Sequence, residues 1–164
     1  VRRAVDDNSR RGDNRMKRLE LLCVGKIKED YLNAGIAEYV KRLGRYCDVV
    51  VTALPDMPDS PTEAEEESKA LSARFDGFVI LADIGGKAVT SEEFSELIGR
   101  AYLTHPKVQF VIGGSRGVTD ELRRRAGARV SFGKVTYPHK LMRLIAAEQL
   151  YRAFTIAEGL PYHK

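Results

Sequence analysis

The sequence of 164 residues contains no tryptophan, only two cysteines and only three histidines. Cys23 and Cys47 form no Cys-x-x-Cys pair, and the scattered histidines give no zinc-ligand spacing. Each cysteine lies in an apolar, β-prone stretch, which predicts two buried free thiols in a reducing compartment. We therefore expect a cytoplasmic protein with neither a disulfide framework nor a metal site.

Long hydrophobic runs are also missing. The longest, such as Phe78–Ala82 and Val108–Ile112, fall far short of the roughly 20 residues that cross a bilayer, so we expect no membrane span. Residues 1–15 (VRRAVDDNSRRGDNR) have no apolar segment of the kind found in secretory signals. We interpret residues 1–15 as a disordered extension ahead of a single domain formed by residues 16–164.

Charge is distributed unevenly along the chain. The formal net charge is +4, yet residues 56–76 hold seven acidic and two basic side chains, whereas residues 100–152 hold eleven basic and three acidic ones. The basic half predicts a polyanionic partner, either a nucleic acid or a phosphate-bearing cofactor. For the run Arg123-Arg124-Arg125 alone, an equally good interpretation is that it ends a helix and balances the helix dipole.

Strands and helices alternate along the sequence. We predict strands at residues 19–24, 49–54, 78–82, 108–112 and 130–132, and helices at 30–46, 62–75, 90–103, 119–126 and 138–158. Thr62 with Glu65, and Thr90 with Glu93, have the spacing of a capping box at a helix start. Because the strands are continuous apolar runs, we expect burial on both faces, which indicates an α/β fold with a mostly parallel sheet covered by helices.

The predicted last helix is apolar on nearly every side. A helix of this kind must be buried on more than one side, and a chain of this length has few places to bury it. We therefore predict a homodimer.

Three glycine-containing segments follow predicted strands: 85–87 (GGK), 113–117 (GGSRG) and 133–137 (GKVTY). Since the carboxyl ends of parallel strands meet at one edge of a sheet, we expect a cofactor cleft there. The sequence has no P-loop pattern and no G-x-G-x-x-G at the first strand, which disfavours a P-loop nucleotide site and a dinucleotide oxidoreductase. Taken alone, the glycines are also compatible with plain turns.

Several motifs together carry a family resemblance. They are residues 22–26 (LCVGK), 110–117 (FVIGGSRG), 131–139 (SFGKVTYPH), 147–153 (AEQLYRA) and the chain end 161–164 (PYHK). In order, spacing and placement they resemble the RlmH family of the SPOUT superfamily, which are bacterial 23S rRNA (pseudouridine-N3)-methyltransferases. The resemblance extends from about Met16 to Lys164.

The resemblance implies a SPOUT-type sheet whose C-terminal segment threads a trefoil knot and binds S-adenosylmethionine. Carried over by position, the cofactor contacts fall at Ala82, Gly113, Gly114, Phe132, Gly133, Lys134, Val135, Thr136 and Tyr137. The resemblance also implies a homodimer that acts on 23S rRNA within the assembled ribosome. The Tyr-His-Lys tail of one subunit would complete the pocket of the other.

Methylation at N3 requires loss of the ring proton. His163 is our candidate base, because an ordinary histidine pKa suits this work near neutral pH. A cation at Arg143 or Lys164 would favour the deprotonated ring, and Tyr162 would stack on the base. A tail of this kind is often merely frayed. Two other functions stay open: a SPOUT methyltransferase with another RNA target, and a non-enzymatic ribosome-associated binding protein.

Overall fold

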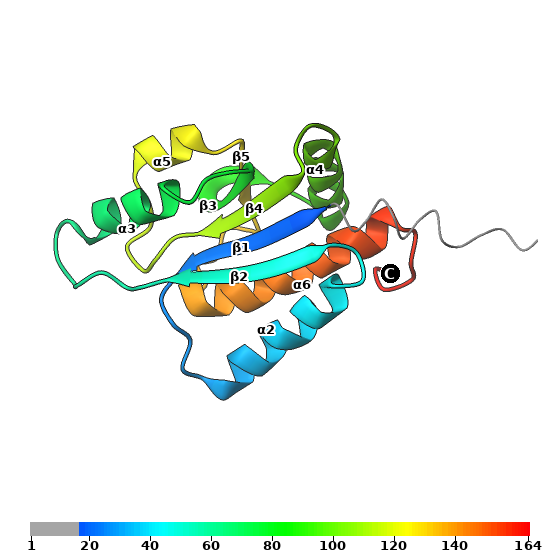
Figure 1. Ribbon diagram of the computed structural model, residues 1–164, viewed down its shortest axis with the longest axis horizontal. Helices are drawn as coiled ribbons and strands as arrows, with labels where there is room; N and C mark the ends of the chain where they lie inside the picture. Colours follow the sequence, from blue (N-terminus) through cyan, green and yellow to red (C-terminus); the bar gives the residue numbers. More distant parts are fainter. Residues whose placement is uncertain (1–16) are drawn as a thin grey trace, which may run out of the picture.

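Five parallel strands form the centre of the molecule, in a computed structural model that describes residues 17–164 (Figure 1). The strands, in the spatial order β2-β1-β4-β3-β5, are β1 (Arg18–Val24), β2 (Asp48–Leu54), β3 (Phe78–Ala88), β4 (Lys107–Ile112) and β5 (Ala128–Ser131). The predicted α/β fold with a parallel sheet is thereby confirmed. The predicted extension, residues 1–15, lies outside the described residues.

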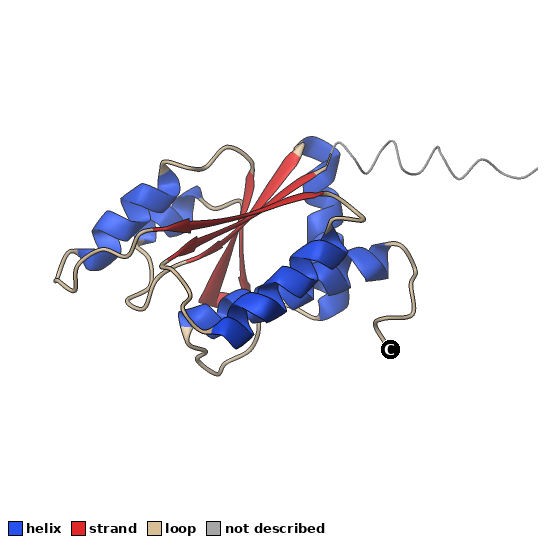
Figure 2. Cartoon of the chain, turned by 60° about the horizontal axis from the view of Figure 1, so that its bottom comes forward, coloured by secondary structure: helices blue, strands red, loops and turns tan. Residues whose placement is uncertain are grey.

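Helices cover both faces of the sheet (Figure 2). They are α2 (Asp30–Leu43), α3 (Glu63–Ser72), α4 (Ser91–Thr104), α5 (Asp120–Arg125) and α6 (His139–Ala157). On one face α6 packs between α2 and α4, and on the other face α3 packs beside α5. No helix within residues 17–164 is long and apolar enough to cross a membrane.

The central strands are apolar on both sides because successive residues enter different cores. In β1, Leu21 and Cys23 join the core beneath α2, α4 and α6, whereas Leu22 joins the core beneath α3 and α5. The prediction that every strand is buried on both faces is wrong for β2, where Val50 is 57% exposed. The reason is that β2 is an edge strand, which pairs only with β1 among the described strands. Both cysteines are buried and free, as predicted, and burial raises the pKa of Cys23 to about 11.

Two local predictions need correction. The Thr62 side chain does not cap the backbone of α3 but lies 3.4 Å from the side chain of Glu66, because Thr62 lacks the extended backbone of a cap residue. The segment Gly85-Gly86-Lys87 is not a loop after a short strand. Instead β3 continues to Ala88, and the glycines lie in an irregular bulge within it.

The apolar surface of α6 is only partly covered within one chain. Its buried residues face the sheet, α2 and α4, and Tyr151 packs against Tyr39 and Tyr46 of the same chain. Several other apolar side chains of the helix stay half-exposed, namely Leu141, Met142, Leu144, Ile145 and Ile156. The homodimer stays a prediction, and so does the trefoil knot.

Candidate functional site

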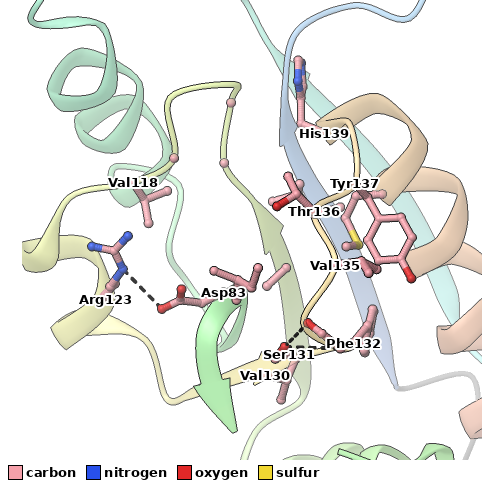
Figure 3. Close-up of a pocket in the computed structure, with 18 residues that line it drawn as sticks. Asp83, Val118, Arg123, Val130, Ser131, Phe132, Val135, Thr136, Tyr137 and His139 are labelled. Atoms are coloured by element: carbon pink, nitrogen blue, oxygen red, sulfur yellow. Dashed lines mark hydrogen bonds and ion pairs between the residues drawn. The ribbon is translucent and has the colours of Figure 1, made fainter. Parts of the chain in front are cut away.

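A cavity of about 240 Å³ opens where β3, β4 and β5 end and α6 begins (Figure 3). Eight of the nine predicted cofactor contacts line it: Ala82, Gly113, Gly114, Phe132, Gly133, Val135, Thr136 and Tyr137. The ninth, Lys134, is exposed and is not among the lining residues. The structure thus brings together three segments that lie up to 55 positions apart in the sequence.

The segment after β4 forms one wall of the cavity. Gly117 has a φ of +76°, and its N–H donates to the carbonyl of Gly114 at 3.0 Å, which closes a tight turn. A Cβ atom at Gly113 would lie 2.6 Å from Cγ1 of Val118, so a larger residue does not fit there. Glycine therefore lets the backbone itself form the wall.

The segment after β5 forms the opposite wall. Gly133 has a φ of +118°, and the Ser131 hydroxyl donates to its carbonyl at 2.8 Å. The ring of Phe132 stacks on Phe110, with ring centroids 5.9 Å apart, and so anchors this wall to the core. The wall is apolar along much of its length, which suits a flat aromatic group of a ligand.

The bulge in β3 forms the third side, and sequence reasoning missed its key residue. Ala82 and Lys87 both pair with Val130, so the residues between them leave the ladder. Among them Asp83 turns into the cavity, and its Oδ2 lies 3.2 Å from Arg123 Nε and 3.3 Å from Arg129 Nη1 (Figure 3). An acidic residue between an apolar strand and a glycine pair was the available signal.

The arginine run of α5 has a mixed role. Arg123 points inward to Asp83 and also pairs with Asp120 at 2.7 Å, whereas Arg124 and Arg125 are exposed. Arg123 is therefore structural, Arg125 lies over the ring of Phe75, and Arg124 is left exposed to a partner.

Arg143, a predicted catalytic residue, is only 4% exposed. Its Nη2 donates to the carbonyls of Val24 and Gly25 at 3.0 and 2.8 Å, so its guanidinium group holds the end of β1. It does not line the cavity, but it lies close enough to lower the pKa of His139, a residue that does.

His139 lies at the far end of the cavity from Val130 (Figure 3). Burial is the main reason that the pKa of His139 is below its usual value, which leaves the ring neutral at pH 7. The ring forms no cap bond to α6, and its Nε2 is buried without a partner among residues 17–164. It is a neutral polar group at the rim.

The C-terminal tail folds against the last turns of α6. The Tyr162 hydroxyl donates to Glu148 Oε1 at 3.0 Å, and His163 lies between Arg152 and Glu92. Because arginine can only donate, Nδ1 of His163 accepts from Arg152 at 3.0 Å, and its Nε2–H donates to Glu92 at 2.7 Å. The terminal Lys164 is exposed.

The tail and the cavity of one chain lie at different ends of α6. His139 begins the helix and lines the cavity, whereas Arg152, which holds His163, lies thirteen residues later. Thirteen helical residues correspond to about 20 Å. Within one chain the structure therefore brings the predicted cofactor contacts together but not the predicted catalytic tail. In the described part of the chain, no cluster of side chains suits a metal ion.

Comparisons with known proteins agree over almost the whole sequence. A solved probable methylase family protein from Haemophilus influenzae Rd KW20 aligns over 92% of this chain and 71% of its own, with a TM-score of 0.47 and 13% identity. Curated proteins called ribosomal RNA large subunit methyltransferase H are much more similar in sequence. The one from Limosilactobacillus reuteri is 46% identical over 157 residues, which cover 89% of this chain and 99% of the relative.

The protein of the same name from Streptococcus equi subsp. zooepidemicus is 44% identical over 160 residues, covering 90% of this chain and 99% of the relative. Residues 16–163 also match the family model described as predicted SPOUT methyltransferase. With nearly every described residue inside these matches, the chain belongs to the SPOUT methyltransferase family.

Proposed function

We propose that the chain transfers a methyl group from S-adenosylmethionine to N3 of a pseudouridine in 23S rRNA, within the assembled ribosome. The observation that carries the proposal is the three-sided cavity at the carboxyl ends of β3, β4 and β5, in a chain of this family. The relatives' shared name refers to RNA of the large ribosomal subunit, which supports the substrate class. Assembled ribosomes and buried free thiols both fit a cytoplasmic location.

The cavity fits this cofactor chemically. Ile112, Val130 and Phe132 offer apolar surface for the adenine, and the glycine backbones leave room for a close approach. Asp83 supplies a buried carboxylate for a polar or positively charged part of the ligand. When bound, S-adenosylmethionine would supply an activated methyl group on its sulfonium, so the protein's task is mainly to hold the two reactants in line.

The remaining task is the proton at N3. A base within hydrogen-bond reach of that atom removes it, and a nearby cation stabilises the resulting anion. We assign the base to His163, whose Nδ1 would have to exchange Arg152 for the N3 proton, and the stacking contact to Tyr162, with Lys164 as a cation at the end of the tail. Arg143 would act electrostatically through the cavity wall, since it does not line the cavity and its Nη2 is engaged by the end of β1.

We assign the tail to the cavity of a second copy. Its own cavity lies about 20 Å away along α6, a distance that the three residues after Pro161 do not bridge while Tyr162 and His163 hold their observed contacts. A homodimer in which each tail closes the partner's cavity resolves this separation. It also explains why an arginine and a glutamate fix the tail histidine on the outside of its own subunit.

Methyl incorporation tests the proposal. Ribosomes that lack the modification and naked 23S rRNA are each incubated with the protein and methyl-labelled S-adenosylmethionine, and the labelled nucleotide is then mapped. We expect label at N3 of one pseudouridine in intact ribosomes and little in naked rRNA. Label on another nucleotide would reassign the target. Equal labelling of naked rRNA would remove the ribosome from the proposal, and no labelling would favour a non-enzymatic binding protein.

A further inference from the structure

The acidic stretch of residues 56–76 has no part in the function proposed so far. Within it α3 turns Glu63, Glu67 and Ser68 inward, and they are only 8%, 2% and 2% exposed. Burial of two carboxyl groups one helical turn apart is costly unless they have partners. The partners lie in the segment after β4, residues 113–119, which we call the donor loop.

Three contacts join α3 to the donor loop. Arg116 Nε donates to Glu63 Oε2 at 3.0 Å, and the Thr119 N–H donates to Ser68 Oγ at 3.0 Å. Between them, Glu67 lies directly behind Gly114: a Cβ atom at Gly114 would lie 3.0 Å from Cδ of Glu67. The helix therefore supports the loop at its start, middle and end, on the side away from the cavity.

One atom of this arrangement lacks a partner. Oε1 of Glu67 accepts from the Met57 N–H at 3.4 Å, but its Oε2 is buried with no hydrogen bond to any residue in 17–164. A buried carboxylate oxygen without a donor is strongly unfavourable. A proton on Oε2 would remove the difficulty, because the resulting hydroxyl could donate to the carboxylate of Glu63.

The charges around Glu67 favour that proton. Burial is the largest cause and raises the pKa of Glu67. The hydrogen bond from the Met57 N–H lowers this pKa, whereas the negative charges of Glu63 and Asp56 raise it. The nearby Glu63 side chain therefore favours the protonated form of Glu67, and the pKa ends above its usual value. Beyond Glu63 lie Arg116, which pairs with Glu63 and Asp59, and the titratable His139, on which Glu63 and Asp56 act electrostatically.

We infer that Glu67 is a positioning residue for methyl transfer: its carboxyl group, linked through Glu63 to Arg116, holds the donor loop in the arrangement that the methyl donor requires. The inference rests on the proposed function in assigning a methyl donor to the cavity. Glu67 touches neither the cavity nor the reacting atoms, since it is absent from the cavity lining. It acts through Gly114 and Arg116.

The proposed link between Glu67 and Glu63 predicts how firmly the donor loop is held at different pH. While Oε2 carries its proton, Glu67 donates to Glu63 and the loop is held. As the pH rises through the pKa of Glu67, the donor is lost and two carboxylates repel each other one turn apart, so the loop loosens. The stabilisation is thus present at low pH and lost at high pH, as for any group whose folded-state pKa is raised.

Hydrogen exchange of the donor loop tests the inference without any ligand. Amide exchange of residues 113–119 is compared in the wild type, Glu67→Gln, Glu67→Ala and the matched control Glu65→Gln, an exposed glutamate of the same helix. Glutamine keeps a donor toward Glu63 and an acceptor for Met57, so we expect exchange as in the wild type. In Glu67→Ala we expect exchange about tenfold faster, confined to this segment. Equal exchange in all four proteins would overturn the inference.

The affinity for S-adenosylmethionine across pH supplies a readout that a merely structural residue would not change. We expect the affinity of the wild type to fall as the pH rises, relative to Glu67→Gln, whose amide cannot ionise. Parallel profiles for these two proteins would also overturn the inference. If the wild type binds no S-adenosylmethionine at any pH, the proposed function fails, and hydrogen exchange alone decides whether Glu67 positions the loop.

Discussion

Gly113 and Gly114 are neighbours in sequence but face opposite sides of the donor loop. A side chain at Gly113 would strike Val118, which lines the cavity, whereas one at Gly114 would strike the carboxyl group of Glu67 behind the loop. A larger side chain at Gly114 would therefore disturb the contact between the donor loop and α3 rather than fill the cavity.

The first prediction concerns this contact. Gly114→Val should lower the affinity for S-adenosylmethionine by about tenfold or more, because either the loop or the buried carboxyl group of Glu67 that supports it must move to relieve the collision. Gly99→Ala is a matched control, since a Cβ atom at Gly99 meets nothing within 4 Å. Calorimetric titration of both variants measures the effect. Wild-type affinity in Gly114→Val would show that the loop does not depend on this contact.

A second prediction separates binding from transfer. His163→Ala should leave the affinity for S-adenosylmethionine unchanged, because His163 is hydrogen-bonded to Glu92 and Arg152 and does not line the cavity of its own chain. Methyl transfer to ribosomes should fall by about a hundredfold, as expected for loss of a general base. Single-turnover kinetics under saturating donor provide the measurement. If turnover is unaffected, His163 has no part in the reaction.

At the scale of elements, the sequence predicts well what depends on local pattern. Each of the five strands and five helices is found near its expected range. The strands are recognisable because successive residues enter cores on opposite faces of the sheet, which requires a continuous apolar run. The helices are recognisable from the residues at their starts. The errors have tertiary causes. The β3 bulge exists because β5 pairs with two separated parts of one strand, and no local pattern encodes that pairing.

Of the two predicted capping boxes, one forms and the other does not, and the difference yields a third prediction. In α4 the Glu93 N–H donates to Thr90 Oγ1 and the Thr90 N–H donates to Glu93 Oε1, both at 3.1 Å. Thr90→Ala should therefore lower the free energy of unfolding by about 1 kcal/mol. Thr62→Ala should change it little, since Thr62 caps no backbone group. Urea denaturation compares the two, and equal losses would contradict the assignment.

At the scale of the whole molecule, the proposed site has two parts, the cavity and the tail, which lie at different ends of α6. The glycine segments were predictable as a cleft because parallel strands end at one edge of a sheet. The role of Glu67 was not predictable, because only the fold brings Gly114 to it. Asp83 had a sequence signal, but its two arginine partners had none, since they too are brought to it by the fold. The helices α2 and α4 cover only part of the apolar surface of α6, so this helix still favours a homodimer. The distance between the tail and the cavity adds to that support.

The fourth prediction tests whether the tail of one subunit acts in the cavity of the other. Gly114→Val damages the cavity and His163→Ala damages the tail, so in a mixed dimer one of the two composite sites is intact. Equal mixtures of the two variants, after subunit exchange, should recover about a quarter of the wild-type activity, although each variant alone is nearly inactive. Recovery that does not exceed the sum of the separate variants would mean that each chain uses its own tail.

The most direct test of the central claim is equilibrium dialysis of the purified protein against labelled S-adenosylmethionine, with NADH in a parallel cell. The claim is that the donor loop, the β3 bulge and the segment after β5 together form a methyl-donor site. It predicts that each chain binds one S-adenosylmethionine and no NADH. A protein that is fully folded yet retains no S-adenosylmethionine would contradict it.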